Sequence, residues 1–242
     1  MVALLWLAAC EKAPTATPLP TPTALKVAIT PALQPIQGAL TLCARAHPEI
    51  ALFVDEIPAG SIDPGKYNLS LRLGLPDQEA AYAVSLGQER IDVIVSPENR
   101  VQSLDEEELR AMFSGSILSW ERVGGEARVV QPWVFVEGAE ARAALDRVIL
   151  KGRPVASQAL VAAGPTAMLA GVADDPGAIG YLPHAWLQKQ VKALQVGSGL
   201  DAALRLPVLA ISASEPQAAP RRFLACLQSG PGKAPIQKIY SP

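Results

Sequence analysis

The sequence contains few of the residues on which catalytic, metal-binding and nucleic-acid-binding proteins depend. Only 2 of its 242 residues are histidine, and the formal net charge is −2. Nucleic-acid binding needs a basic surface that neutralises phosphates, so this charge balance argues against a nucleic-acid partner. His47 and His184 stand neither in a His-Glu-x-x-His spacing nor beside paired cysteines. We therefore expect no metal site.

Motifs for covalent chemistry are missing as well. The chain has no Gly-x-Ser-x-Gly elbow, and Gly230–Lys233 lacks both the spacing and the hydroxyl of a phosphate-cradling loop. His47 lies on the apolar stripe of a helical pattern and His184 follows a proline, so both are expected to be structural or surface residues. We expect Trp120 and Trp186 to fill a hydrophobic core. The sequence predicts neither an enzyme nor a cofactor.

Long hydrophobic runs are also missing. The apolar run at the start of the chain, Val2–Ala9, is far shorter than the ~20 residues that a membrane-spanning helix needs. Its end, Leu7–Cys10, resembles a bacterial lipobox, which implies cleavage by a signal peptidase and a lipid attached to Cys10. No Lys or Arg precedes the run, although secretion signals usually begin with positive charge. The alternative is a short buried helix with a chance cysteine.

The segment after Cys10 favours the lipoprotein interpretation. Glu11–Ala24 reads EKAPTATPLPTPTA and has neither a helical nor a strand period. In a polyproline-like conformation it would reach about 40 Å, at ~3.1 Å per residue, which is enough to hold a domain clear of a membrane. We expect residues 1–10 to be a lipoprotein signal and residues 11–24 to be a tether, with the rest of the protein extracytoplasmic.

The remainder of the chain has the composition of a globular protein. Half of all residues are apolar and 18% are charged. If Cys10 is lipidated, Cys43 and Cys226 are left. They form either one disulfide, as an oxidising compartment allows, or two buried thiols without a bond.

Short β-branched runs alternate with amphipathic segments, a pattern typical of an α/β fold. Strands are expected at Leu25–Ile29, Ile50–Val54, Asn68–Leu73, Ile91–Val95, Val129–Val136, Ile179–Leu182 and Leu206–Ile211. Helices are expected at Pro35–Ala46, from a capping box at Ser103–Glu106 to Gly115, and at Gly138–Leu150, with a turn at Asp174–Gly177.

Three segments resemble the phosphate-type periplasmic binding proteins. Leu104–Gly125 matches the family pattern F-x-G-x-I-x-x-W-x-x-V-G-G with Phe113, Gly115, Ile117, Trp120, Val123, Gly124 and Gly125. Ala173–Tyr181 is similar to the family's pGAIGY turn and strand, and Phe223–Pro242 to its closing helix and tail. The resemblance covers most of residues 25–242.

The resemblance implies a type II periplasmic-binding-protein fold, with two α/β lobes and the ligand between them. Lobe one would combine residues 25–95 and 196–242, and lobe two would be residues 96–195, with crossings near Val95–Asn99 and Leu194–Gly197. It further implies a monomeric substrate-binding component that captures a small solute, such as an oxyanion, and delivers it to an ABC permease. Helix N-termini that face such a cleft suit anions.

The anion loop of relatives, Gly-Ser-Gly-Thr-Arg, reads Gly138-Ala139-Glu140-Ala141-Arg142 here. Both hydroxyls are missing, and Glu137 and Glu140 are added. A carboxylate ~4 Å from a bound oxyanion costs roughly 4 kcal/mol at an effective dielectric constant of 20, or about a thousandfold in affinity. We therefore expect weak phosphate binding. Glu137 and Glu140 either complement the helix dipole, as acidic residues in a first helical turn do, or form a cation site. In the first case an internal carboxylate would also compete with any anionic ligand. Arg142 is either an anion contact, as in relatives, or a surface helix residue.

The other candidate ligand residues lie in loops that follow predicted strands. Thr30 and Ala32 belong to the loop after the first strand, where Thr30 offers a hydroxyl to the cleft or simply caps a helix. Ser96 and Asn99 lie at the expected crossing, where an ordinary turn is the alternative. Gly74 ends another strand. The altered anion loop leaves a second function open, in which the fold serves as a cell-surface sensory or interaction module without solute capture.

Overall fold

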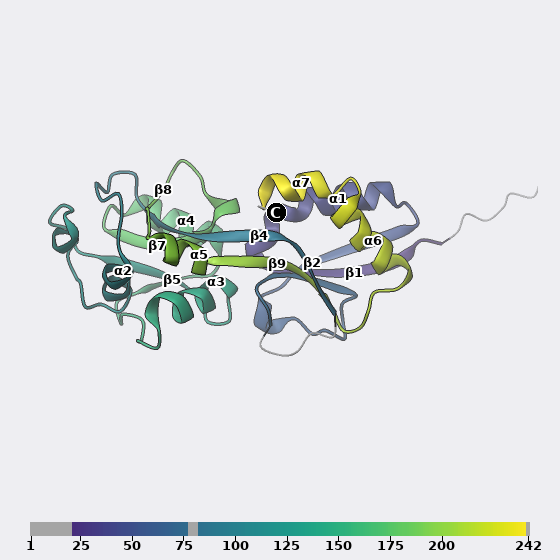
Figure 1. Cartoon of the computed structure of the whole chain (residues 1–242), viewed down its shortest axis with the longest axis horizontal. Helices are drawn as coiled ribbons and strands as arrows, with labels where there is room; N and C mark the ends of the chain where they lie inside the picture. Colours follow the sequence, from purple (N-terminus) through teal and green to yellow (C-terminus); the bar gives the residue numbers. More distant parts are fainter. Residues whose placement is uncertain (1–20, 77–81, 241–242) are drawn as a thin grey trace, which may run out of the picture.

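Two strands, β4 (Tyr82–Val95) and β9 (Arg205–Ser212), connect the two lobes of an elongated molecule (Figure 1). The structure is a computed structural model that describes residues 21–76 and 82–240. Cys10 and most of the expected tether lie outside the described residues. Strand β1 already begins at Thr23, so the last two residues assigned to the tether belong to the sheet.

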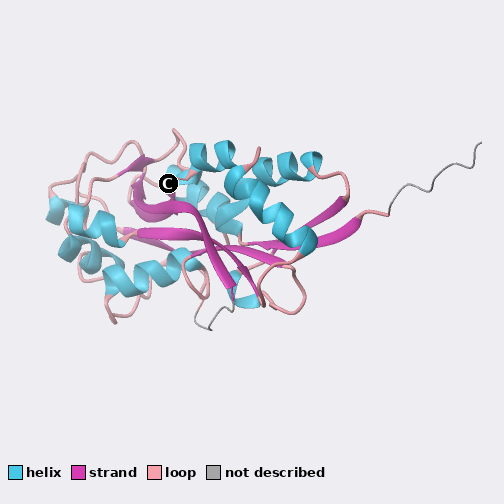
Figure 2. Ribbon diagram, turned by 45° about the vertical axis from the view of Figure 1, so that its right-hand side comes forward, coloured by secondary structure: helices cyan, strands magenta, loops and turns pink. Residues whose placement is uncertain are grey.

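The first lobe is built on a mixed sheet. Strand β1 (Thr23–Ile29) pairs in parallel with β2 (Ile50–Glu56) and β3 (Leu69–Leu73), and β3 pairs antiparallel with β9. Figures 1 and 2 show three helices packed together over one face of this sheet. These helices are α1 (Gln37–Ala46), α6 (Ala218–Ser229) and α7 (Lys233–Ile239). Short 3₁₀ turns lie at Pro31–Ile36 and Ala59–Ser61.

The second lobe is built around β7 (Ala178–Pro183), all six residues of which are buried. It pairs antiparallel with β4 and in parallel with β5 (Gln131–Phe135), which in turn pairs with β6 (Leu160–Ala162). The remaining elements are β8 (Lys192–Ala193), α2 (Glu106–Phe113), α3 (Glu140–Ala144), α4 (Pro165–Asp174), α5 (Ser198–Ala203), a π-helix at Leu145–Leu150, and 3₁₀ turns at Trp120–Val123 and His184–Trp186.

Strand β4 belongs to the sheets of both lobes. Its first part, Tyr82–Arg90, pairs with β9, whereas Ile91–Val95 pairs with β7. The chain therefore passes into the second lobe within a strand, upstream of the expected crossing at Val95–Asn99. The apolar run Ile91–Val95 is buried because it continues directly into the second sheet.

The capping box of α2 differs from the predicted one. The N-cap is Asp105, whose carboxylate accepts the Glu108 N–H at 2.8 Å while the Glu108 side chain accepts the Asp105 N–H at 2.9 Å. Ser103 is instead bridged to Gln195 in an extended conformation, so it cannot open the helix. The predicted end is confirmed, since Gly115 adopts φ +79° after the helix. The expected core residues Leu109, Met112 and Phe113 are buried.

Two other predicted helices are interrupted. The segment expected to be one helix over Pro35–Ala46 begins as a 3₁₀ turn and becomes α-helical only at Gln37. The segment Gly138–Leu150 starts its α-helix at Glu140 and continues as a π-helix from Leu145. The predicted turn before β7 is confirmed, because the Asp175 carboxylate accepts the Gly177 N–H at 2.7 Å.

Only one of the two tryptophans expected in the core is fully buried. Trp120 is 1% exposed, and its indole donates to the Gly177 carbonyl at 2.8 Å. Trp186 is only half-buried, and its indole Nε1 donates to the Ala32 carbonyl of the first lobe at 2.8 Å. Its polar edge therefore links the two lobes while the side chain packs against the hydrophobic core, so the expected core role is confirmed only in part.

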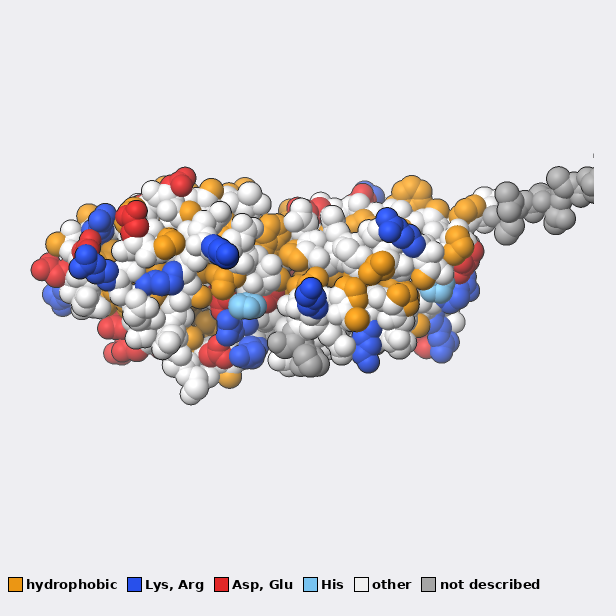
Figure 3. All heavy atoms as spheres, turned by 90° about the horizontal axis from the view of Figure 1, so that it is seen from above, with side chains coloured by type: hydrophobic (Ala, Val, Ile, Leu, Met, Phe, Trp, Pro, Cys, Tyr) orange, Lys and Arg blue, Asp and Glu red, His pale blue; other side chains and the backbone are white. Residues whose placement is uncertain are grey.

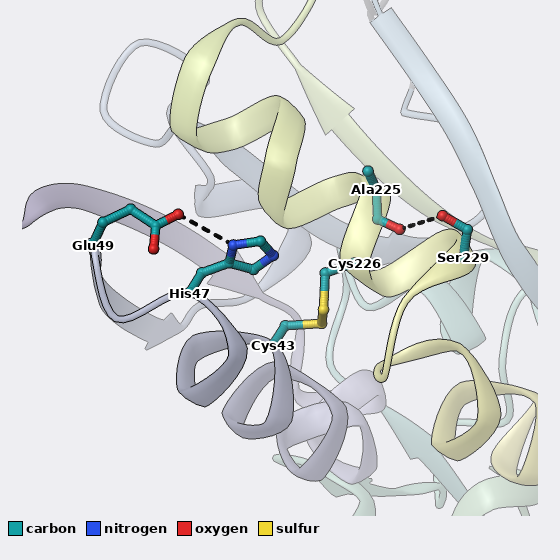
Figure 4. The surroundings of a disulfide bond; sticks show 6 residues. All are labelled: Cys43, His47, Glu49, Ala225, Cys226 and Ser229. Carbon is teal, nitrogen blue, oxygen red and sulfur yellow. Dashed lines mark hydrogen bonds and ion pairs between the residues drawn. A yellow bond between two sulfur atoms is a disulfide. The ribbon is translucent and has the colours of Figure 1, made fainter.

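Cys43 and Cys226 form a disulfide (Figure 4). The bond joins α1 to α6 across a sequence separation of 183 residues. It decides between the two alternatives that the sequence left open. A Cβ atom on Gly232 would lie 2.6 Å from the Cys43 sulfur, so this glycine lets the chain after α6 pass close to the bond. Figure 4 also shows His47 next to the disulfide, paired with Glu49 at 3.2 Å.

A polar cluster lies where β4 enters the second lobe. The Glu89 carboxylate is 2% exposed and accepts the N–H groups of Arg90 and Ala185 at 2.8 and 3.3 Å. Asp92 pairs with Arg90 and with His184, both at 2.6 Å. The cluster borders a cavity of about 230 Å³ lined by Gln88, Glu89, Arg90, His184, Arg205 and Ile239. His184, expected to be a structural or surface residue, is partly exposed and pairs with Asp92 in this cluster.

On the face drawn in Figure 3, basic and acidic side chains of the described residues are interspersed, in keeping with the net charge of −2. Among residues 21–76 and 82–240, no helix is both long and apolar enough to cross a membrane.

Removing the disulfide should destabilise the protein strongly. Cross-linking two residues so far apart restricts the unfolded chain, and loss of a native disulfide typically costs about 2 to 5 kcal/mol. We expect the Cys43→Ala/Cys226→Ala variant to unfold at a clearly lower urea concentration than the oxidised protein. Reduced wild-type protein is the control and should unfold near the double variant. Equal urea midpoints for the variant and the oxidised protein would contradict the prediction.

Glu89 should make stability depend on pH. Burial raises its pKa from 4.5 to about 7, so the folded state binds a proton that the unfolded state releases. Its contribution is therefore present below about pH 4.5 and lost as the pH rises through about 7, by up to about 3 kcal/mol. In urea titrations at about pH 5 and pH 8, Glu89→Gln should show a smaller stability loss than wild type. The same loss in both proteins would exclude Glu89 as the source.

Candidate ligand site between the lobes

Helix α3 and strand β3 meet at the junction of the two lobes. Glu140, the first residue of α3, extends its side chain to the other lobe, where its Oε1 accepts the Leu73 N–H at 2.9 Å. Leu73 is the last residue of β3. The Glu140 side chain is buried, with the residue only 8% exposed. A carboxylate of the second lobe is thus bound by a backbone donor of the first.

Two more groups of the first lobe act on this carboxylate. Thr30 is fully buried, and its hydroxyl makes no hydrogen bond of normal geometry, yet it lies close enough to Glu140 to favour the ionised form. The Nε of Arg72 is also buried without a partner. Burial raises the pKa of Glu140, and the Leu73 N–H, the Thr30 hydroxyl and the Arg72 charge oppose that shift. These groups form an anion-binding arrangement with the Glu140 carboxylate inside it.

The rest of the predicted anion loop turns towards its own lobe. Arg142 is paired with Asp146 at 2.9 Å and donates to the Phe135 carbonyl at 3.1 Å, so its guanidinium is already engaged. Gly138 adopts φ +82°, which lets the chain turn into the helix. Ala139 is the N-cap residue, supplies no side-chain acceptor, and donates its N–H to the Val136 carbonyl at 3.3 Å.

Ser96 and Asn99 make their hydrogen bonds within their own turn and its neighbours. The Ser96 hydroxyl accepts the Glu98 N–H at 3.4 Å. The Asn99 side chain accepts the Val101 N–H at 3.0 Å and donates to the Pro176 carbonyl at 3.4 Å. Both side chains are buried and hold the start of the second lobe in place.

The two remaining candidates contribute backbone groups. Gly74 donates its N–H to the Pro207 carbonyl at 2.8 Å and turns the chain after β3 with φ +67°. Ala32 supplies the carbonyl that Trp186 binds from the other lobe. Ala32 and Thr30 lie in the same short segment after β1. Ala32 is bound by Trp186 of the second lobe, and Thr30 lies close to Glu140.

Sequence reasoning missed two members of this site. The Leu73 N–H is a backbone donor and leaves no trace in a side-chain pattern. Arg72 could have been found from the sequence, because it is a charged residue within the short strand β3, directly before the strand's last residue. Within the described residues, no three His, Cys, Asp or Glu side chains come together in a group that could hold a metal ion.

Comparisons with known proteins agree on the fold. No family model matches the sequence. The phosphate-binding protein PstS of Bacillus subtilis (strain 168) is 28% identical over 103 residues, which is 42% of this chain and about a third (34%) of that relative.

Solved structures match over most of the chain. A putative phosphate ABC transporter substrate-binding protein with bound phosphate from Clostridium perfringens superposes with a TM-score of 0.80 at 16% identity, covering 90% of this chain and 98% of its own. An ABC-type phosphate transport receptor from Vibrio cholerae gives a TM-score of 0.74 at 20% identity, with 90% and 100% coverage. Regulatory domains also share the fold. The chain therefore has the two-lobed α/β fold of the phosphate-type periplasmic substrate-binding proteins.

Proposed function

We propose that this protein is the solute-binding component of an ABC-type importer, held at the outer face of the cell membrane by a lipid on Cys10. The fold and the partial sequence match to a phosphate-binding protein support this role. A disulfide between Cys43 and Cys226 suits an oxidising, extracytoplasmic compartment. In this role the protein captures a solute between its lobes, presents it to a permease as a monomer, and performs no chemistry.

The observation that carries this proposal is the set of donors at the lobe junction. The Leu73 N–H of the first lobe donates to the Glu140 carboxylate of the second. The buried Thr30 hydroxyl lies close to the same carboxylate, and the positive charge of Arg72 acts on it electrostatically. Hydrogen-bond donors and a cation around a buried position are what a small anion requires. We therefore assign the solute to the small anions.

Phosphate itself fits this junction poorly. The Glu140 carboxylate occupies the donors that a phosphate group would need, and like charges close together in a buried site repel strongly. The residue best suited to pair with an oxyanion, Arg142, is bound to Asp146. A less highly charged anion, or one with a different shape, meets a smaller penalty at the same place.

A thermal-shift screen of the full chain carrying Cys10→Ser tests this function. The panel consists of phosphate, sulfate, other oxyanions, amino acids, sugars and metal ions. A ligand at 100 times its dissociation constant adds ~2.7 kcal/mol, which raises the melting temperature by roughly 5 to 10 °C for a protein of this size. A shift with an anion supports the proposal. A flat response across the panel contradicts it and favours the interaction module.

Restoring the missing loop residues should strengthen anion binding. We expect wild-type protein to bind phosphate weakly, and Ala139→Ser/Glu140→Gly/Ala141→Thr to bind it up to about a thousandfold more tightly, because the variant removes a carboxylate worth roughly 4 kcal/mol and adds two hydroxyls. Isothermal titration with phosphate measures both. The matched control is Ala139→Ser/Ala141→Thr, which keeps Glu140 and should gain little. A submicromolar dissociation constant for the wild type would refute the prediction.

The anchor is tested separately. Cys10→Ser should move the protein from the membrane fraction to the soluble extracytoplasmic fraction of expressing cells, because the lipid attachment site is lost. Lys66→Ser, an exposed position that leaves both Cys10 and the disulfide intact, is the control and should stay with the membrane. A membrane-bound Cys10→Ser protein would rule out this anchor.

A further inference from the structure

The Glu140 side chain contacts the opposite lobe, which an acidic residue at the start of a helix does not ordinarily do. An acidic residue in the first turn of a helix ordinarily complements the N-terminal dipole while remaining in contact with water. Glu140 instead buries its carboxylate against β3 of the other lobe, at 2.9 Å from the Leu73 nitrogen. Its neighbour Glu137 remains exposed in the same loop. The position of Glu140 therefore depends on the other lobe.

The first lobe places two further polar groups near this carboxylate. Thr30 is fully buried, and its hydroxyl lies close to Glu140 without a hydrogen bond of normal geometry. The buried Nε of Arg72 has no partner, and its positive charge favours the ionised carboxylate. A buried donor without a partner costs free energy, and so does a buried carboxylate without donors. When the lobes come together, water leaves both the carboxylate and the polar groups of the first lobe. These groups then stabilise the charge of the carboxylate electrostatically. Separating the lobes returns them to water.

A second contact acts in parallel. The indole of Trp186 in the second lobe donates to the Ala32 carbonyl at 2.8 Å. Ala32 lies in the same loop as Thr30, so the loop after β1 faces partners from two separate segments of the other lobe. Together the two contacts join the first lobe to the second through groups of the chain itself.

We infer that the Glu140 carboxylate is an internal ligand, which takes the place of a solute's anionic group and holds the lobes together in the empty protein. This inference rests on the proposed function only in that a solute must displace this carboxylate in order to bind. It makes Glu140 a residue that determines specificity. A solute gains nothing by entering unless it replaces the carboxylate and accepts hydrogen bonds from the donors that the carboxylate leaves. The carboxylate therefore selects against anions that fit these donors poorly.

The distance between the lobes in the absence of solute tests the inference. Spin labels at Lys66→Cys and Arg147→Cys, two exposed positions on opposite lobes, report this distance by double electron–electron resonance in a Cys10→Ser background. Wild-type protein without solute should give one narrow, short distribution. Glu140→Ala should give a longer and broader one. Glu140→Gln, which keeps an acceptor for Leu73 but loses the charge, should fall between them.

Glu137→Ala is the matched control, since it removes an exposed carboxylate from the same loop and should leave the distribution unchanged. Circular dichroism establishes that each variant is folded, and Glu140→Gln carries the test if Glu140→Ala does not fold. Distributions that do not differ between wild type and folded Glu140 variants overturn the inference, as does a wild type that is already open. Because no solute is added, a failed solute screen leaves this result unaffected.

Discussion

The pairing of β4 with both β9 and β7 is the interaction on which the rest of the structure depends. A single strand of 14 residues belongs first to one sheet and then to the other, so the two lobes are joined by hydrogen-bonded strands instead of loose loops. This joint fixes which elements face each other. It brings the end of β3 opposite the start of α3, and the loop after β1 opposite Trp186. Each contact between the lobes follows from this arrangement.

Glu89 and Glu140 are buried carboxylates at the junction of the lobes, and each accepts at least one backbone N–H. Glu89 is held by Arg90 and Ala185 where β4 enters the second lobe, and Glu140 is held by Leu73 of the opposite lobe. Burial raises the pKa of both. Each carboxylate therefore joins segments that are far apart in the sequence, Glu89 linking β4 to the turn that contains Ala185, and Glu140 linking the start of α3 to the end of β3.

The fold was largely predictable, whereas the site was predictable only in part. Runs of β-branched residues predicted seven of the strands, because burial on both faces of a central strand leaves a continuous apolar run. The position of Glu140 followed from its alignment with a known loop. The Leu73 donor and the Ala32 carbonyl are backbone groups that no side-chain pattern reveals. Ser103 and Asp105 both precede a glutamate by three residues, and only the bridge to Gln195 decides between them. A tryptophan side chain is mostly apolar, so the sequence predicts burial for Trp186. Its indole N–H instead makes a hydrogen bond at the lobe junction.

The link between α1 and α6 also constrains the order in which the protein can mature. Lobe one is assembled from the two ends of the chain, while the elements from α2 to β8 follow one another without interruption in lobe two. The first lobe therefore cannot be completed before its C-terminal helices have been made. The Cys43–Cys226 bond spans 183 residues, so it can form only after the whole of lobe two has been synthesised, and its formation marks a late step in assembly.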